Sequence, residues 1–372
     1  MSAKKNDDRK SVVVVGGGHA GVNLARPLSA QLDASKYKLV LINPRPYRVL
    51  LPATLRMVVS DAQNLQSTAL VPYDKLFHNG NGVFIQDSVR SMDDKVLTLG
   101  SGEQVPYDVL VLCSGMAWAD PIAFPDTAED VKSYISRSHE KFARAGNYLI
   151  VGGGAIGCEL AGELKDIWPE REITLVHAER LLLNDTYTDR YRRRVADQLV
   201  ARGIKIHLGD LVEDIPDHTG PAVVLTKGGL KLSTDLVVRA VGAPRPNTSF
   251  INSLNPDALT PAGFVKVKPT LQLHDYPNIF AAGDIVDWNE QKQAIKAQDH
   301  AKIVAKNIVN HFNGAPLKTY KTAFEAIFLT NGKNGGITYL GFLWGIIFGS
   351  WFTRLLKSRD LLVSRFRKEN GL

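Results

Sequence analysis

The stretch Ser11–Gly21, SVVVVGGGHAG, constrains the fold of this chain more than any other segment. Its four consecutive valines predict a short, fully buried strand of a parallel sheet. The strand runs directly into Gly-x-Gly-x-x-Gly, and the following Val22–Leu32 favours a helix. In such a turn the glycines permit the tight bend, the close approach of a pyrophosphate and the packing of helix on strand. The candidate dinucleotide cradle is Gly16, Gly17, Gly18, His19, Ala20 and Gly21.

The same pattern occurs a second time, which makes it much more specific than a single glycine motif. Asn147–Gly157, NYLIVGGGAIG, repeats it with an offset of 136 residues. Two nucleotide-binding modules imply two nucleotides, and electron transfer between them is the usual chemical reason. The likeness continues into the helices, where Leu24, Ala25 and Leu28 correspond to Leu160, Ala161 and Leu164. The second cradle is predicted to comprise Gly152, Gly154, Ala155, Ile156 and Gly157.

The residue that ends the second strand of each module bears on which nucleotide binds. A dinucleotide fold usually carries an Asp or Glu there, on the ribose hydroxyls. The first module has Asn43, which can bond a ribose but carries no charge. The second module has His177, with Arg180 nearby. Because His177 does not repel a 2′-phosphate as an acid would, we expect both NADH and NADPH to be accepted.

Three short turns after predicted strands bring further backbone toward the nucleotides. Ser114 and Gly115 end the strand that closes the first module, and Gly242 lies in the corresponding turn of the second. Gly283 and Asp284 follow a strand near residue 280. An Asp in that place can bond the ribityl hydroxyls of a flavin, and the next helix points its N-terminus at the same group.

The order of these segments predicts an α/β protein with two Rossmann-like dinucleotide-binding domains. Phe264–Val267 and Ile279–Ala282 are predicted strands that return to the first domain, so the second domain interrupts it. Val83–Ser88 and Lys95–Leu99 are predicted as two strands of a small sheet. We predict a first, FAD-binding domain of residues 1–118 and 255–315, a second, NAD(P)H-binding domain of 119–254, and a small C-terminal region of 316–372.

The C-terminal region differs in composition from the rest of the chain. From His311 to Leu372 there are nine Lys and Arg against three acids, which accounts for +6 of the net charge of +7. Ile337–Phe352 is uncharged and rich in aromatics, but it is too short and glycine-broken to span a bilayer. Apolar aromatics beside a basic cluster favour peripheral attachment to an anionic membrane through residues 337–368, rather than to nucleic acid. The other interpretation is a buried hairpin that covers the flavin domain.

The sequence contains neither a C-x-x-C motif nor histidines at metal-ligand spacing, which argues against dithiol and metal chemistry. Cys113 and Cys158 form no C-x-x-C pair, so the sequence offers no redox dithiol, and we expect two buried thiols. The histidines lack the spacing of metal ligands, so no metal site is expected.

Taken together, the two GGGxxG modules and the CSG, VGxxRPN and AAGD turns resemble the flavoproteins with two dinucleotide-binding domains. Within that group the chain looks like the ferroptosis suppressor and apoptosis-inducing-factor-like NAD(P)H:quinone oxidoreductases. The matching segments are Leu55-Arg56, Gly157-x-Glu159, Pro277–Asp284, Ala305–Asn310 and, most specifically, Leu356–Ser364, LKSRDLLVS.

The resemblance implies FAD on the first module and NAD(P)H on the second. It implies that Glu159 lies where flavin and nicotinamide meet, and that Arg56 lies near FAD. It also implies that Lys357 lies near the flavin, where a cation stabilises negative charge on the flavin or on a quinone oxygen. Glu159 and Lys357 are therefore the candidate catalytic residues. Asn43 departs from the family, which has an acid at that position.

The predicted function is FAD-dependent NAD(P)H:quinone oxidoreductase. A hydride would pass from NAD(P)H to the flavin N5, and two electrons would then pass to a membrane quinone, which would support the trapping of lipid radicals. Three alternatives stay open: a type II NADH dehydrogenase, a reductase of an iron–sulfur carrier protein, and an apoptosis-inducing-factor-like effector switched by its redox state. We expect a cytoplasmic protein on a membrane such as a lipid droplet or the mitochondrial outer membrane, with a homodimer as one possible assembly.

Overall fold

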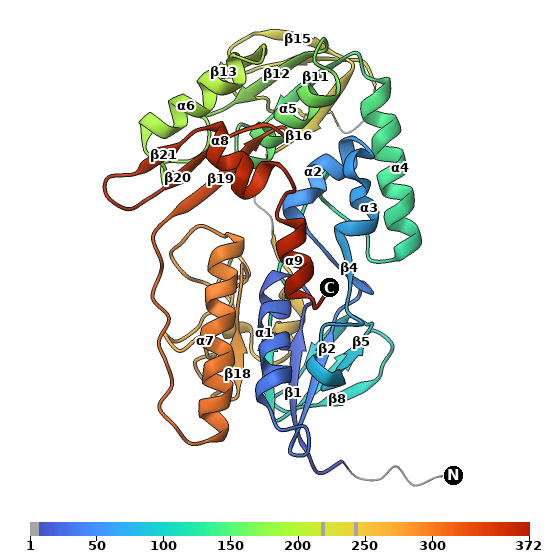
Figure 1. The fold of residues 1–372 in the computed structure, drawn as a ribbon, viewed down its shortest axis with the longest axis vertical. Coiled ribbons are helices and arrows are strands. Elements are labelled where there is room, and N and C mark those ends of the chain that lie inside the picture. Colours follow the sequence, from blue (N-terminus) through green and yellow to red (C-terminus); the bar gives the residue numbers. More distant parts are fainter. Residues whose placement is uncertain (1–6, 217–219, 242–244) are drawn as a thin grey trace.

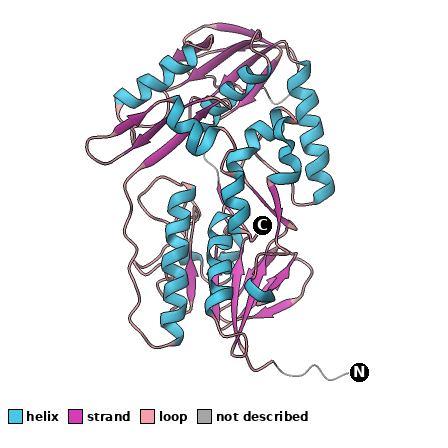
Figure 2. Cartoon of the chain, viewed as in Figure 1, coloured by secondary structure: helices cyan, strands magenta, loops and turns pink. Residues whose placement is uncertain are grey.

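A computed structural model describes residues 7–216, 220–241 and 245–372 of the chain (Figure 1). The described residues form two α/β modules and a C-terminal region that lies against both. Figure 2 shows helices packed against strands in each module. Strands of the second module fall, along the chain, between strands of the first. This confirms the predicted α/β class, with one dinucleotide-binding fold interrupted by another.

The first module is built on a five-stranded parallel sheet in the order β18-β9-β1-β2-β5. Its central strand β1 contains the valine run, and Val12, Val13 and Val14 are completely buried. Apolar residues on both faces are what a central parallel strand requires. The strands are β1 Lys10–Val15, β2 Tyr37–Ile42, β5 Val83–Ile85, β9 Val109–Leu112 and β18 Ile279–Ala281.

The expectation that Val83–Ser88 and Lys95–Leu99 share a small sheet is wrong for the first segment. β5 pairs in parallel with β2 at the edge of the main sheet, where Val83 lies opposite Val40. Both segments are short and apolar, and such runs do not specify which neighbour they pair with. The separate antiparallel sheet consists of β6 Val89–Met92, β7 Val96–Leu99 and β8 Gln104–Pro106.

Helices α1 and α7 pack side by side on the first sheet, and smaller elements complete this module. A two-stranded sheet joins β10 and β17 where the chain crosses between the modules. These elements are α1 His19–Gln31, α2 Leu51–Val59, α3 Leu65–Thr68, α7 Ala294–Phe312, β3 Tyr47–Val49, β4 Leu70–Pro72, β10 Met116–Ala117, β17 Arg245–Pro246, η1 Ala62–Asn64, η2 His78–Gly80, η3 Ser249–Ser253 and η4 Pro256–Ala258.

The second module repeats the first on a smaller scale, with a four-stranded parallel sheet in the order β13-β12-β11-β16. Strand β11 holds the central place that β1 holds in the first sheet. Its elements are α4 Ala128–Arg144, β11 Asn147–Val151, α5 Ala155–Ile167, β12 Glu172–His177, α6 Asp189–Val200, β13 Ile204–Leu208, β16 Leu236–Arg239 and the hairpin of β14 Ala222–Leu225 and β15 Lys231–Thr234.

The C-terminal region forms an antiparallel sheet that packs mainly on helix α5 of the second module. Ile337 and Tyr339 are buried there, and the hydroxyl of Tyr191 on α6 donates to the carbonyl of Ile337 at 3.3 Å. The apolar segment 337–352 is thus partly core. Its elements are β19 Ala326–Asn331, β20 Gly335–Leu340, β21 Ile346–Phe348, α8 Ser350–Thr353, the π-helical turn η5 Arg354–Ser358 and α9 Val363–Glu369.

The turn of that apolar segment is exposed, whereas Ile346–Phe348 of β21 are half-buried. Leu343 and Trp344, in the turn between β20 and β21, are 69% and 96% exposed. Across the described residues, none of the helices combines the length and the apolar character that a membrane crossing requires.

Candidate functional site

The first glycine loop bends so tightly that two of its glycines leave no room for a side chain. Gly16 has a φ of +106°, and a Cβ there would lie 2.2 Å from the carbonyl oxygen of Cys113. A Cβ at Gly21 would lie 1.9 Å from the carbonyl oxygen of Gly16, so α1 could not pack on the loop. Gly18, the N-cap of α1, differs, because no described atom lies within 4 Å of its Cβ position. The first N–H groups of α1 therefore border open space.

The second loop repeats this geometry residue by residue. Gly152 has a φ of +118°, and its Cβ would lie 2.4 Å from the carbonyl oxygen of Ala240. A Cβ at Gly157 would lie 1.9 Å from the Gly152 carbonyl oxygen, whereas Gly154, the N-cap of α5, again borders open space. Within the described residues neither α1 nor α5 has a side-chain cap or an acid in its first turn. Both helix N-termini are left free for an anion such as a phosphate.

Asn43 and His177 hold the middle glycine of each loop. Asn43 Oδ1 accepts a hydrogen bond from the Gly17 N–H at 2.9 Å, and His177 Nδ1 accepts one from the Gly153 N–H at 3.1 Å. Burial lowers the pKa of His177. Since an accepting Nδ1 carries no proton, the neutral ring bears its proton on Nε2. The two side chains that the sequence pointed to for nucleotide specificity therefore also position the loops.

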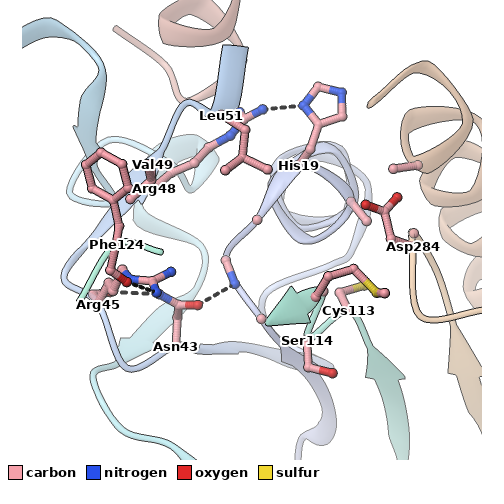
Figure 3. A pocket seen from close by; sticks show the side chains of 18 of the residues that line it. His19, Asn43, Arg45, Arg48, Val49, Leu51, Cys113, Ser114, Phe124 and Asp284 are labelled. Atoms are coloured by element: carbon pink, nitrogen blue, oxygen red, sulfur yellow. Dashed lines mark hydrogen bonds between the residues drawn. The ribbon is translucent and has the colours of Figure 1, made fainter. Parts of the chain in front are cut away.

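A cavity of about 440 Å³ opens in front of the first loop (Figure 3). Asp284 lies on its wall, and burial raises the pKa of this carboxyl although Lys292 opposes the shift. The Ser114 hydroxyl donates to the carbonyl of Asn247 at 2.6 Å and so ties the two crossing segments together. Ten of the predicted FAD residues line this cavity: Gly16, Gly17, Gly18, His19, Ala20, Asn43, Ser114, Gly115, Gly283 and Asp284.

The C-terminal helix α9 closes one side of this cavity, which sequence reasoning did not anticipate. Phe366 lines the cavity and meets the His19 ring edge-on, at a centroid distance of 5.0 Å. Arg48, whose side chain is 2% exposed, contacts His19 Nδ1, pairs with Glu369 at 3.3 Å and donates to Asn370 Oδ1 at 3.0 Å. Burial, together with the charge of Arg48, lowers the pKa of His19 to about 2. The cation Arg48 directly before the apolar residues Val49–Leu51 was a usable signal for this contact. The docking of α9 had no such local signal.

A larger cavity of about 1150 Å³ adjoins the first. Gly154, Ala155, Ile156 and His177 line it as predicted, whereas Gly152 and Gly157 lie behind the loop, where they permit its turn and packing. The predicted Gly242 lies outside the described residues. The two cavities share eight lining residues: His19, Leu51, Pro52, Trp118, Ile122, Asp284, Ala294 and Phe366.

The structure brings the two candidate catalytic residues together on the wall of this larger cavity. Lys357 Nζ lies 2.7 Å from Glu159 Oε1 and donates to the carbonyl of Phe328 at 2.9 Å. Glu159 Oε1 also accepts the N–H of Thr330 at 2.8 Å. Each of the two charged side chains is 14% exposed and lines the cavity. A charge-assisted pair of this kind holds an ammonium group in one place beside whatever occupies the cavity.

Arg56 does not lie where the resemblance placed it, because it lines neither cavity. Its guanidinium forms an ion pair with Glu163 on α5 at 2.7 Å, and both side chains are 4% exposed. A buried guanidinium without a partner is costly, so the side chain turns to the buried carboxylate instead of the FAD loop.

Neither cysteine provides a redox dithiol. Cys113 and Cys158 are both free and buried, as the sequence indicated. Burial raises the pKa of Cys113 to about 12, and it also raises that of Cys158. Both thiols therefore stay protonated and unreactive at neutral pH.

A comparison with known proteins identifies the family of this chain. The profile described as pyridine nucleotide-disulphide oxidoreductase matches residues 10–301. The chain belongs to this family. FAD-dependent oxidoreductase FVFD30 of Flammulina velutipes is 45% identical over 322 residues, which are 85% of this chain and 99% of that protein. Ferroptosis suppressor protein 1 of Mus musculus is 31% identical over 95% of this chain and 94% of its own.

A solved structure agrees on the fold. The sulfide:quinone oxidoreductase of Aquifex aeolicus superposes with a TM-score of 0.77 over 97% of this chain and 92% of its own, at 21% identity. The predicted likeness to ferroptosis suppressor and apoptosis-inducing-factor-like proteins is confirmed by relatives of both names. This family member is thus an FAD-dependent oxidoreductase with a pyridine nucleotide as substrate.

The described residues fit both nucleotides. The Gly18 and Gly154 positions are open, and the helices behind them have no side-chain cap, so each loop can take a pyrophosphate without displacing protein atoms. We propose Gly16–Ala20, Asn43, Ser114, Gly115, Gly283 and Asp284 for FAD, and Gly154–Ile156, Glu159 and His177 for the pyridine nucleotide.

We expect Gly157→Ala and Gly154→Ala to fail in different ways. The new methyl group of Gly157→Ala meets the Gly152 carbonyl, so the melting temperature should fall by roughly 5 °C. The methyl group of Gly154→Ala enters only the open cradle, so the fold should persist while NADH binding weakens about tenfold. Calorimetry and NADH titration measure the two effects. Equal loss of stability in both variants would contradict the assignment.

The pKa of His19 predicts a pH dependence of stability. Folded His19 stays neutral down to about pH 2, whereas the unfolded chain protonates it near pH 6.5. The unfolded state therefore binds more protons below pH 6.5, and the free energy of unfolding falls there by up to about 1.4 kcal/mol per pH unit from this group. Above pH 6.5 His19 is neutral in both states, so it no longer makes the free energy of unfolding depend on pH. Chemical denaturation of His19→Gln should show a flatter profile between pH 6.5 and 5, and an unchanged slope would refute a buried neutral ring.

Proposed function

We propose that this family member is an NAD(P)H:quinone oxidoreductase that works at a membrane surface. The observation that carries the proposal is the Glu159–Lys357 pair on the wall of the larger cavity, next to the second glycine loop. FAD, when bound, supplies the chemistry that takes a hydride from NAD(P)H and hands two electrons to an acceptor. The chain's own residues would select and hold the two substrates.

The walls of the larger cavity suit a quinone beyond the nucleotide cradle. Leu55, Ile327, Phe328 and Leu362 line it, and they come from the first module and from the C-terminal region. These residues form an apolar stretch of wall beside Lys357 in a cavity that many polar and charged residues also line, and apolar walls with a few placed polar groups are typical of sites for flat, apolar ligands. In the proposal the Lys357 ammonium stabilises negative charge on a quinone oxygen, and Glu159 holds that ammonium and orients the nicotinamide ribose.

The same wall supports the use of both NADH and NADPH. His177 and Arg180 line the cavity, so a 2′-phosphate would meet a neutral ring and a cation. Arg180 is already paired with Asp189 at 2.8 Å, and Glu179 lines the cavity beside it. These acids offset the cation, so we propose that neither nucleotide is strongly excluded.

Exposed apolar residues of the C-terminal region support attachment to a membrane. Trp344 and Trp351 are 96% and 77% exposed, and Leu355 is 62% exposed. Arg354 and Arg359 are exposed nearby. Aromatic side chains beside cations favour the headgroup layer of an anionic bilayer. Because Leu355 and Lys357 share one turn, we propose that a lipid-soluble quinone reaches the cavity from this surface.

Stopped-flow absorbance of the bound flavin tests the quinone assignment. After reduction by NADH, a short-chain ubiquinone analogue should reoxidise the flavin rapidly in the wild type. Lys357→Ala should slow that second phase by about 10²-fold, the typical effect of removing one charge-stabilising donor, and affect the first phase less. Lys333→Ala, which removes an exposed lysine of the same region, is the matched control. Rapid reduction of the flavin by NADH, followed by no reoxidation by quinone, would contradict the proposal.

Flotation with anionic lipid vesicles tests the membrane assignment. Trp344→Ser should lower the bound fraction, because burying an indole in the interface supplies much of the attraction. Val223→Ser is the control, since Val223 is 68% exposed but lies on β14 of the second module. Equal flotation of wild type and Trp344→Ser, or equal loss in both variants, would speak against the hairpin turn as the anchor.

A further inference from the structure

Helix α5 carries a second acid one turn beyond Glu159, and it too has a cationic partner. Glu163 and Glu159 lie four residues apart and therefore on the same side of the helix. Glu159 binds Lys357, whereas Glu163 binds Arg56 in a two-bond arrangement, with Nε at 2.7 Å from Oε2 and Nη2 at 2.9 Å from Oε1. The function described above uses the first pair and leaves the second, more deeply buried pair without a role.

Arg56 extends this pair to the turn that carries Lys357. Its Nη2 also donates to the carbonyl of Ser358 at 3.0 Å, and its Nη1 donates to Gln63 Oε1 at 2.8 Å. Gln63 Nε2 in turn donates to the carbonyl of Arg359 at 3.1 Å. Two consecutive carbonyl groups directly after Lys357 are thus held by side chains of the first module, while Glu163 fixes the guanidinium from the second.

The turn that carries Lys357 is π-helical, and we infer that the side-chain donors Arg56 and Gln63 help to hold its backbone. Residues Arg354–Ser358 close their backbone with an i to i+5 bond, from the Arg359 N–H to the Arg354 carbonyl at 3.3 Å. Such turns are rare and are frequently found at functional sites. Leu355 and Leu356 are 62% and 40% exposed, whereas Ser358 is completely buried and its hydroxyl donates to the carbonyl of Gly335 at 2.7 Å. The inner contacts of the turn are polar.

We infer that Arg56 and Glu163 are positioning residues for Lys357. Their buried ion pair fixes the backbone at Ser358, and that backbone sets where the Lys357 ammonium meets Glu159 at the cavity wall. Neither residue lines either of the two cavities described above, so the proposal gives neither a contact with a substrate. This inference rests on the proposed function of Lys357, and it assigns to Arg56 a place different from the FAD contact that the resemblance implied.

A double variant separates positioning from stability. Removing one partner alone leaves a buried charge and risks unfolding, whereas replacing a buried pair by apolar residues of similar size is often neutral or stabilising. We therefore choose Arg56→Met/Glu163→Leu, with Gln63→Ala as a second variant at an exposed position in η1. Asp166→Asn is the matched control, because Asp166 also lies on α5 but pairs with Arg202 and accepts the Lys333 N–H in the turn between β19 and β20, not a group of the π-helical turn.

The primary readout is the rate at which an amine-reactive reagent modifies Lys357, followed by mass spectrometry of the FAD-loaded protein. Modification in the double variant should rise about tenfold over wild type, because the ammonium loses its fixed place beside Glu159. It should rise less in Gln63→Ala and stay at the wild-type rate in Asp166→Asn. In the same double variant kcat with quinone should fall about tenfold, while the KM for NADH stays unchanged.

Two results would overturn the inference. The first is a folded double variant with wild-type modification of Lys357, and the second is an equal rise in Asp166→Asn, which would show general loosening of α5. If wild type reduces no quinone at all, the proposed function fails, but the modification rates still decide whether Arg56 and Glu163 position Lys357.

Discussion

The nucleotide sites depend on the close approach of glycine to neighbouring carbonyl groups. Gly16 and Gly152 each lie where a Cβ would meet the carbonyl oxygen of the strand beside them. This contact brings each helix up against its strand and directs its free N–H groups at a cavity. Gly21 and Gly157 permit the same packing one turn later. A side chain at any of these positions would push the helix away from its strand and distort the cradle of that module.

The C-terminal region supplies walls to both nucleotide cavities. Phe366 and Glu369 on α9 reach back to His19 and Arg48 and close the first cavity. Lys357, one element earlier, meets Glu159 of the second module at the other cavity. Residues more than 190 positions apart in sequence thus form one charged contact. The apolar surface of this region faces outward, so the segment that completes the site also carries the exposed aromatics.

Local patterns were enough to predict the fold and the positions of the two glycine loops. The valine run, the glycine spacing and its exact repetition are short-range signals, and they placed the central strands and helices correctly. Local signals did not predict the contacts of Arg56. A motif match indicates that an arginine is needed, but the buried carboxylate that captures it comes from α5, over 100 residues later. The partner of strand β5 and the docking of α9 likewise depend on long-range packing, which no local pattern encodes.

The central claim is that the two adjoining cavities let a hydride pass directly from pyridine nucleotide to flavin. Stopped-flow bleaching of the flavin with NADH deuterated on one or the other face of C4 tests it most directly. The two cavities share eight lining residues, so they adjoin. A nicotinamide held there in one orientation would offer one face of C4 to the flavin, so the account predicts a primary isotope effect with one deuterated form and none with the other. Slowing by neither form, with bleaching fast in both, would contradict direct transfer between these sites.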